Sequence, residues 1–228
     1  MEALRNPSGV ILVGIVLTLI VLIESLEIIP WSPYFLIYAA LAIIIPIWLK
    51  SYKFGKLVDV FKQNLVFIVI IFVIIAVFSV AIDFIYEQLL VSSGLSGDPM
   101  YDFNAALVAL AHKAAIKFGI SDLNATLIYA VYIIVWAPIG EELFYRGYMY
   151  GELKQRMNKY AAMLISTFFF GIRHATHFFF LLPEYPLIPG IYWAVHAFIF
   201  GLIIVYLYEK TDSLYPPMII HFLANVLF

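Results

Sequence analysis

Long apolar segments, each close to the length needed to cross a lipid bilayer, dominate this sequence. The chain has 228 residues, of which 64% are hydrophobic and 12% are charged, and its mean hydropathy is +1.00. A soluble domain of this length cannot bury so much apolar surface, so the sequence predicts a protein whose solvent is lipid. The first apolar run reaches Ile29 without a small-residue cleavage signal, which favours a first span over a removed signal peptide.

Seven spans are expected, because a hydrocarbon core of about 30 Å needs roughly 20 apolar residues per helix. The expected segments are Gly9–Ile29, Tyr34–Leu49, Asn64–Tyr86, Leu123–Tyr145, Tyr160–Leu182, Ile191–Tyr208 and Leu214–Phe228. The last is short, and an eighth span is expected if the natural protein continues. No internal repeat is visible, so the predicted fold class is all-α: a polytopic membrane helix bundle forming one domain over residues 1–228.

Basic residues flank the second and fourth spans, and the positive-inside rule places both flanks in the cytoplasm. The two clusters are Lys50, Lys53, Lys56 and Lys62, and Arg146, Lys154, Arg156 and Lys159. If the short apolar stretch Phe103–Phe118 also spanned, the second cluster would face outward. We therefore expect this stretch to be an amphipathic helix on the outer interface.

Composition excludes several classes of function. The net charge of −2 argues against a nucleic acid partner, since phosphate binding needs a basic surface. The absence of cysteine excludes a thiol nucleophile, disulfides and cysteine-ligated zinc. No serine lies in a Gly-x-Ser-x-Gly turn, so nothing supports a serine nucleophile.

Two adjacent acids stand at the end of the fourth predicted span, in the sequence Glu-Glu-Leu-Phe-Tyr-Arg-Gly. Glu142 and Arg146 are four residues apart, so they share a helix face in the favourable order for an ion pair. Glu141 is rotated from this face by about 100°. Either the two acids mark the water interface, or one is neutralised by Arg146 while the other is free for chemistry.

Histidines occur inside the fifth span, where His174 follows Phe170 by four residues and His177 comes three residues later. Polar side chains at this depth are costly and are retained when they pair, face a wet cavity or act in function. The alternative is a satisfied core histidine beside an arginine, Arg173, that reaches toward water.

The last span places His221 and Asn225 on one helix face. Both can donate hydrogen bonds without carrying charge, which suits an oxyanion, although such a pair can also join helices. His196 stands alone in the sixth span and is interpreted as a packing residue outside the site. Together, a desolvated carboxylate, two histidines and an amide favour hydrolysis by an activated water.

These motifs, Glu-Glu-x-x-x-Arg, Phe-x-x-x-His and His-x-x-x-Asn in this order on separate spans, resemble the CPBP intramembrane protease family. Its best-known members are the type II CAAX prenyl endopeptidases, the Ras-converting enzymes. The resemblance covers about Leu123 to Asn225, within a motif-bearing core at about 123–228, and the first three spans carry none of it. It implies cleavage of a peptide bond near the C-terminus of a prenylated CAAX-type protein or peptide. It implies a multi-pass cell-membrane protein, in contact with membrane lipid, whose active site faces the cytoplasm.

The resemblance also implies roles for the motif residues. Glu141 and His174 would activate the attacking water, His221 and Asn225 would bind the oxyanion, and His177 has no assigned role. Glu142 and Arg146 would support the pocket.

No cofactor is expected, although a zinc site made of Glu141, His174 and His221 is possible. The spacing His-Glu-x-x-His is absent, and Asn225 is a poor zinc ligand. Two other functions stay open: a proton-coupled carrier, because intramembrane acids and histidines also mark ion pathways, and a membrane immunity protein, which the family includes.

Overall fold

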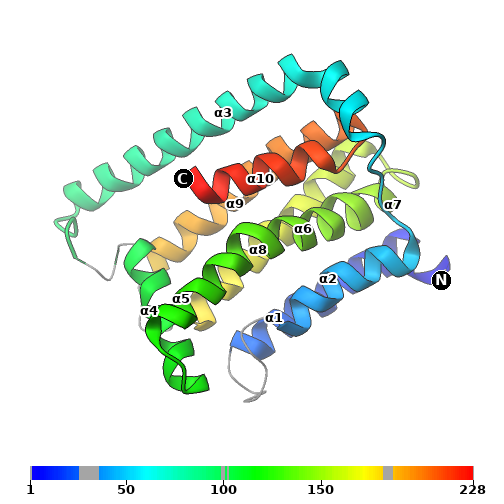
Figure 1. Cartoon of the computed structure of the whole chain (residues 1–228). Coiled ribbons are helices and arrows are strands. Elements are labelled where there is room, and N and C mark those ends of the chain that lie inside the picture. Colours follow the sequence, from blue (N-terminus) through cyan, green and yellow to red (C-terminus); the bar gives the residue numbers. More distant parts are fainter. Residues whose placement is uncertain (1, 26–35, 99–100, 102, 182–186, 228) are drawn as a thin grey trace.

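The computed structural model describes residues 2–25, 36–98, 101, 103–181 and 187–227, and over these residues the chain is a bundle of helices without strands (Figure 1). A helix lies at each of the seven segments expected to span. These helices are α1 (Pro7–Ser25), α2 (Leu36–Leu49), α3 (Leu57–Ser92), a composite helix described below, α8 (Lys159–Leu181), α9 (Leu187–Thr211) and α10 (Tyr215–Leu227). The prediction of an all-α fold is confirmed.

The composite helix runs without a break from residue 122 to residue 153. Its parts are α5 (Asp122–Val131), the π-helix η3 (Tyr132–Trp136), α6 (Ala137–Glu141), the π-helix η4 (Glu142–Tyr150) and α7 (Gly151–Leu153). Single π-helical turns are rare and are frequent at functional sites. Here they lie on both sides of Glu141.

Four helices of the described chain are long and apolar enough to cross a membrane. They cover Pro7–Glu24, Leu57–Ser92, Asp122–Leu153 and Leu187–Thr211. Ile37–Leu49 and Tyr215–Leu227 are shorter apolar helices, and α8 contains the charged Arg173 in its middle. The helices are therefore where the sequence predicts them, while the number of seven crossings is not confirmed.

The observed bounds of α3 and α4 can be compared with the segments predicted from the sequence. Helix α3 begins seven residues before the expected Asn64 and ends six residues after the expected Tyr86, because its polar ends continue as exposed helix. Helix α4 (Phe103–Phe118) has the expected bounds and contacts α5, where His112 Nδ1 lies 2.9 Å from Asp122 Oδ1. Its position on a membrane interface stays a prediction.

The η4 segment lies at the centre of the bundle, between α2 on one side and α8 on the other. All nine of its residues are buried. Gly147 makes the approach of the segment after α2 possible, because a Cβ at this position would lie 2.8 Å from the backbone oxygen of Ser51. The glycine that closes the Glu-Glu-Leu-Phe-Tyr-Arg-Gly motif thus serves close packing.

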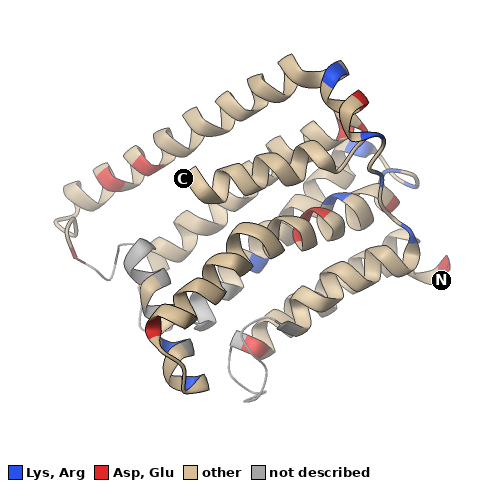
Figure 2. Cartoon of the chain, viewed as in Figure 1, with Lys and Arg blue, Asp and Glu red and all other residues tan. Residues whose placement is uncertain are grey.

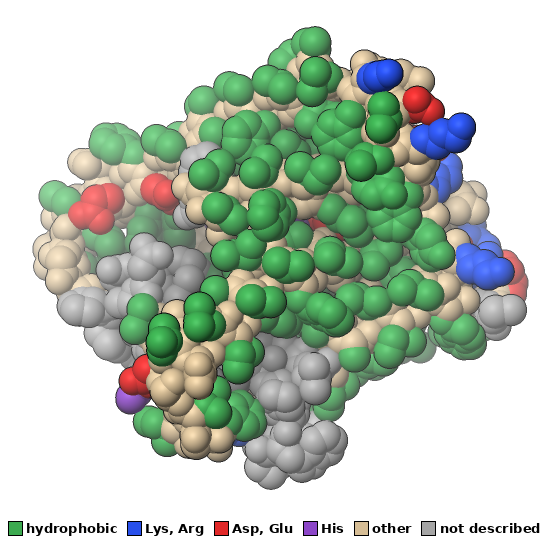
Figure 3. Space-filling view, viewed as in Figure 1, with side chains coloured by type: hydrophobic (Ala, Val, Ile, Leu, Met, Phe, Trp, Pro, Cys, Tyr) green, Lys and Arg blue, Asp and Glu red, His purple; other side chains and the backbone are tan. Residues whose placement is uncertain are grey.

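Apolar side chains cover the visible face between the two ends of the bundle (Figure 3). On α3, Val66, Val77 and Val80 are each more than half exposed. Valine side chains have no hydrogen-bonding groups, so contact with lipid buries them away from water without leaving a polar group unsatisfied. This outer surface is that of a protein embedded in a membrane.

Most of the 13 lysines and arginines lie at one end of the bundle, whereas acidic residues occupy the opposite end of α3 (Figure 2). The residues of this basic end are Arg5, Lys50, Lys53, Lys56, Lys62, Lys154, Arg156, Lys159 and Lys210. The positive-inside rule predicts that the basic end faces the cytoplasm.

Because the chain has no cysteine, single cysteines can test this orientation. Lys53→Cys reports on the basic end, and Ser93→Cys reports on the exposed turn after α3. We expect a membrane-impermeant maleimide to label Ser93→Cys in intact cells and Lys53→Cys only after permeabilisation. The reverse pattern would show the opposite orientation, and labelling in detergent confirms that both thiols are reactive.

Candidate active site

The paired acids lie in the middle of the composite helix and not at its end, as the sequence had suggested. Helix continues for twelve residues beyond Glu141 to Leu153, a distance of about 18 Å at 1.5 Å per residue. Glu141 is 2% exposed and Glu142 is fully buried. The alternative in which both acids mark the water interface is therefore wrong.

Glu142 and Arg146 form the predicted ion pair, with Arg146 Nη1 3.0 Å from Glu142 Oε1. Arg146 is 1% exposed, its Nη2 lies 3.4 Å from the backbone oxygen of Gly201, and its guanidinium lies 4.5 Å from the ring centre of Phe170. A side chain on Gly201 would contact both Thr167 and Arg146. The geometry of this pair thus depends on α8 and α9 as well as on its own helix.

Glu141 has a cationic partner that the sequence interpretation missed. Arg173 on α8 places Nη1 3.0 Å from Glu141 Oε1 and is 5% exposed, so it does not reach toward water. Its guanidinium also lies 4.9 Å from the ring centre of Tyr38 on α2. Each glutamate is therefore neutralised by its own arginine. These are ion pairs by distance only, because Glu141 Oε1 and Arg146 Nη1 make no hydrogen bond of good geometry.

His174 is connected to Glu141 through Arg173. The same Arg173 nitrogen that pairs with Glu141 lies 3.2 Å from His174 Nε2, and His174 Nδ1 lies 2.7 Å from the backbone oxygen of Phe170. A carbonyl oxygen accepts only, so Nδ1 carries the proton and the Nε2 lone pair accepts from the guanidinium. His174 is a neutral imidazole in this arrangement.

His221 lies between the two glutamates. Its Nδ1 donates to Glu142 Oε1 at 2.7 Å, and its Nε2 is 3.9 Å from Glu141 Oε2. A carboxylate on one ring nitrogen fixes the orientation and tautomer of a histidine. The distance to Glu141 is too long for a direct hydrogen bond and suits a bridging water.

Asn225 lies one turn after His221, as predicted, and its Nδ2 donates to the backbone oxygen of Ile133 at 2.9 Å. In the π-helix η3 each backbone N–H donates to the carbonyl oxygen five residues earlier, as the Ala137 N–H does to Tyr132 O. The next donor in this register would be residue 138, which is a proline without an N–H. Asn225 thus satisfies a carbonyl that Pro138 leaves free, and keeps a second amide N–H.

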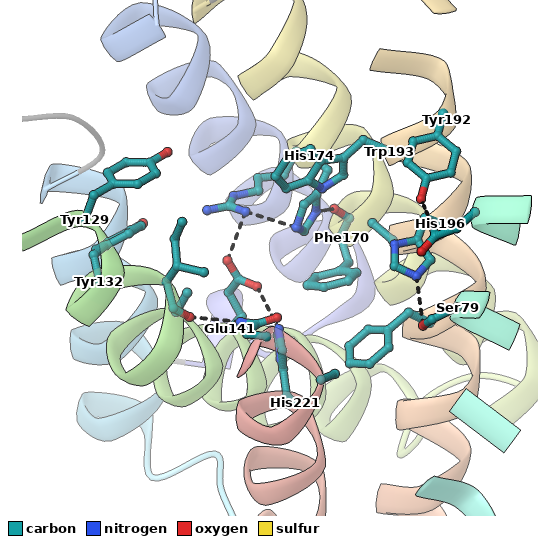
Figure 4. A pocket seen from close by; sticks show the side chains of 18 residues that line it. Ser79, Tyr129, Tyr132, Glu141, Phe170, His174, Tyr192, Trp193, His196 and His221 are labelled. Carbon is teal, nitrogen blue, oxygen red and sulfur yellow. Dashed lines mark hydrogen bonds and ion pairs between the residues drawn. The ribbon is translucent and has the colours of Figure 1, made fainter. Parts of the chain in front are cut away.

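These side chains line one cavity of about 270 Å³ (Figure 4). It is lined by Glu141, Arg173, His174, His221 and Asn225, together with aromatic and polar residues of α3, α5, η3 and α9. Tyr129 also lines it and lies about 36 Å from Leu153 by helix rise, so the cavity runs from Glu141 away from the basic end.

The positions of His196 and His177 relative to the cavity differ in how far the structure describes them. His196 makes the interhelical contact expected of a packing residue, with Nε2 3.4 Å from Ser79 Oγ on α3, and its side chain also lines the cavity. His177 belongs to α8, but its side chain lies outside the described residues.

The residues proposed for zinc do not fit a metal. Among the described side chains, no group of three histidines, cysteines or acids is arranged to hold an ion. Arg173 directs a positive guanidinium at both Glu141 and His174, and the Nδ1 of His221 is engaged by Glu142. A dication at this point would be repelled by Arg173.

Comparison with known families gives an independent result. Residues 123–227 match the model of the type II CAAX prenyl endopeptidase Rce1-like family. This part of the chain is an Rce1-like domain. No curated protein and no solved structure matches the chain.

The Rce1-like domain contains all the motif residues predicted from the sequence, and the rest of the chain adds to its site. Tyr38 of α2 packs on Arg173, and Ser79 and Asp83 of α3 line the cavity. The long apolar helices, together with the Rce1-like domain, identify the chain as an integral membrane protein. The family implies a protease that acts on prenylated proteins in general.

We expect the Glu142–Arg146 pair to be required for stability. Arg146→Met leaves Glu142 as an uncompensated buried charge, and the free energy of unfolding should fall by about 3–5 kcal/mol. Thermal unfolding in detergent measures the change. The matched control is Asp212→Asn, which removes the exposed ion pair with Lys53 and should cost less than about 1 kcal/mol. Equal losses in both variants would contradict a special role for the buried pair.

Proposed function

We propose that this chain is an intramembrane endopeptidase that hydrolyses a peptide bond near the C-terminus of prenylated CAAX-type substrates. The observation that carries the proposal is the pair of groups facing each other across 3.9 Å in the cavity, Glu141 Oε2 and His221 Nε2. Membership of the Rce1-like family supports the substrate class.

Both facing atoms are hydrogen-bond acceptors, which favours a water molecule between them. Since Nδ1 of His221 donates to Glu142, its Nε2 presents a lone pair. A water that donates one hydrogen to Glu141 and one to His221 keeps its own lone pairs free for a carbonyl carbon. This arrangement supports His221 as a partner in water activation, in place of the oxyanion role expected from the resemblance.

In the proposed reaction the water oxygen attacks the scissile carbonyl carbon as one of its protons passes to Glu141 or His221. The negative charge that develops on the carbonyl oxygen is stabilised by the second amide N–H of Asn225 and by the nearby Arg173. The stored proton then passes to the leaving nitrogen as the C–N bond breaks, which releases a carboxylic acid and an amine. The second water proton, left on the carboxylic acid, passes on to the amine, so the products are a carboxylate and an ammonium group. His174 holds the Arg173 guanidinium against Glu141.

The proposed reaction requires no metal ion, because Arg173 supplies the positive charge at the site. Zinc bound in stoichiometric amount to the purified protein, with loss of turnover on chelation and recovery on addition of zinc, would overturn this part of the proposal.

The side from which a substrate enters follows from the depth of the cavity. The basic end is expected in the cytoplasm, and the cavity runs from Glu141 toward the other end. We therefore propose that the lipidated substrate reaches Glu141 from within the bilayer. This differs from the site facing the cytoplasm that was expected from the resemblance.

Cleavage of a short farnesylated CAAX peptide by the purified protein, followed by mass spectrometry of the products, tests the proposal. We expect wild type to release the last three residues and both Glu141→Gln and His174→Ala to abolish cleavage. Asn225→Ala should lower kcat about 10²–10³-fold if its amide binds the oxyanion. Glu87→Gln, an exposed acid of α3 outside the cavity, is the control for altered charge.

The same experiment separates the proposal from a carrier or an immunity protein. Either alternative predicts that the peptide stays intact with wild type. Near-normal cleavage by Glu141→Gln, in a variant whose unfolding temperature is unchanged, would refute Glu141 as the base.

A further inference from the structure

The cavity contains a second group of polar side chains on the wall formed by α3 and α9, away from Glu141 (Figure 4). Asp83 accepts a hydrogen bond from the Tyr192 hydroxyl. His196 stacks on Tyr192 with ring centres 6.1 Å apart and contacts Ser79. Neither the motifs nor the proposed reaction uses any of these residues.

Asp83 differs from the other carboxylate of the cavity in its charge balance. Glu141 is neutralised by Arg173, whereas Asp83 has no ion-pair partner within the described part of the chain. Its one described polar contact comes from a neutral phenol. The Asp83 side chain is itself exposed, so water can solvate it in the empty cavity. At membrane depth a carboxylate is costly unless water or a cation compensates it.

A bound substrate changes this balance. A peptide that fills a cavity of about 270 Å³ displaces the water that would otherwise solvate Asp83. The carboxylate then needs a replacement for that solvation, and a positive charge supplies it best in a medium of low dielectric constant. A neutral or acidic side chain would leave the charge of Asp83 buried and uncompensated.

Aromatic rings beside Asp83 favour the same ligand chemistry. Tyr192 is stacked on both Tyr86, with ring centres 4.2 Å apart, and His196, and Trp193 also lines the cavity. The faces and rims of such aromatic groups, tryptophan above all, attract ammonium and guanidinium groups. Carboxylate and aromatic faces together are the recognition elements expected for the end of a lysine or arginine side chain.

We propose that Asp83, Tyr192 and His196 form a substrate subsite that binds a cationic side chain close to the scissile bond. The inference rests on the proposed peptidase function, and it adds a preference in the peptide that the prenyl group does not provide. Asp83 supplies the charge, and Tyr192 holds its carboxylate toward the cavity.

Paired peptides test the subsite. Each farnesylated peptide carries either lysine or glutamine at one position flanking the scissile bond, and kcat/KM is compared within each pair. At one position we expect wild type to prefer lysine by about tenfold, the size of one charge-assisted hydrogen bond. Asp83→Asn, which keeps an acceptor for Tyr192, should lower this ratio to about one.

Glu87→Gln is the matched control, because Glu87 lies one turn further along α3, outside the cavity, and accepts from Ser96. It should keep the tenfold preference. Equal ratios in wild type and Asp83→Asn, or a preference for glutamine at every position, would overturn the inference.

A binding measurement separates this inference from the peptidase function. The affinity of the same fluorescent peptides for wild type and Asp83→Asn in detergent can be measured by anisotropy without turnover in the Glu141→Gln background. If no peptide is cleaved but lysine still binds about tenfold tighter than glutamine, the peptidase proposal fails and the subsite stands. If peptides are cleaved and bound without regard to charge, only the subsite fails.

Discussion

Charge compensation inside an apolar bundle is the constraint on which the rest of this structure depends. Two adjacent glutamates lie buried near the middle of one long helix, where an unpaired charge would cost several kcal/mol. Arg146 neutralises Glu142 from the same helix, and Arg173 neutralises Glu141 from α8. The second pair joins α8 to α6, so the ion pairs also tie α8 to the composite helix.

The same pairs determine what is left for chemistry. Once Glu142 is bound by Arg146 and by Nδ1 of His221, the opposite nitrogen of His221 faces the free oxygen of Glu141. Cavity, base and orienting groups then come from five helices, α3, the composite helix, α8, α9 and α10. Rigid helices position such groups more accurately than loops do, which a reaction without a covalent intermediate requires.

The sequence predicted the helices and the pairs of residues within one helix, but it missed the contacts between residues on different helices. The apolar runs predicted where the helices lie, and the spacing of four residues predicted the ion pair between Glu142 and Arg146. Spacing along one helix carries no information about the facing residue on another, so the contacts of Arg173 with Glu141 and of His221 with Glu142 were not foreseen. Pro138 was a usable signal, because its missing N–H predicts a free carbonyl that needs a donor such as Asn225.

The proposed reaction requires an ionised Glu141, paired with Arg173, that can accept a proton from water. Infrared difference spectra of wild type against Glu141→Gln at neutral pH test it most directly, because ionised and protonated carboxyl groups absorb at separate frequencies. We expect the variant to lack one ionised carboxylate band. The loss of a protonated carboxyl band instead would contradict it, since a protonated Glu141 cannot act as the base.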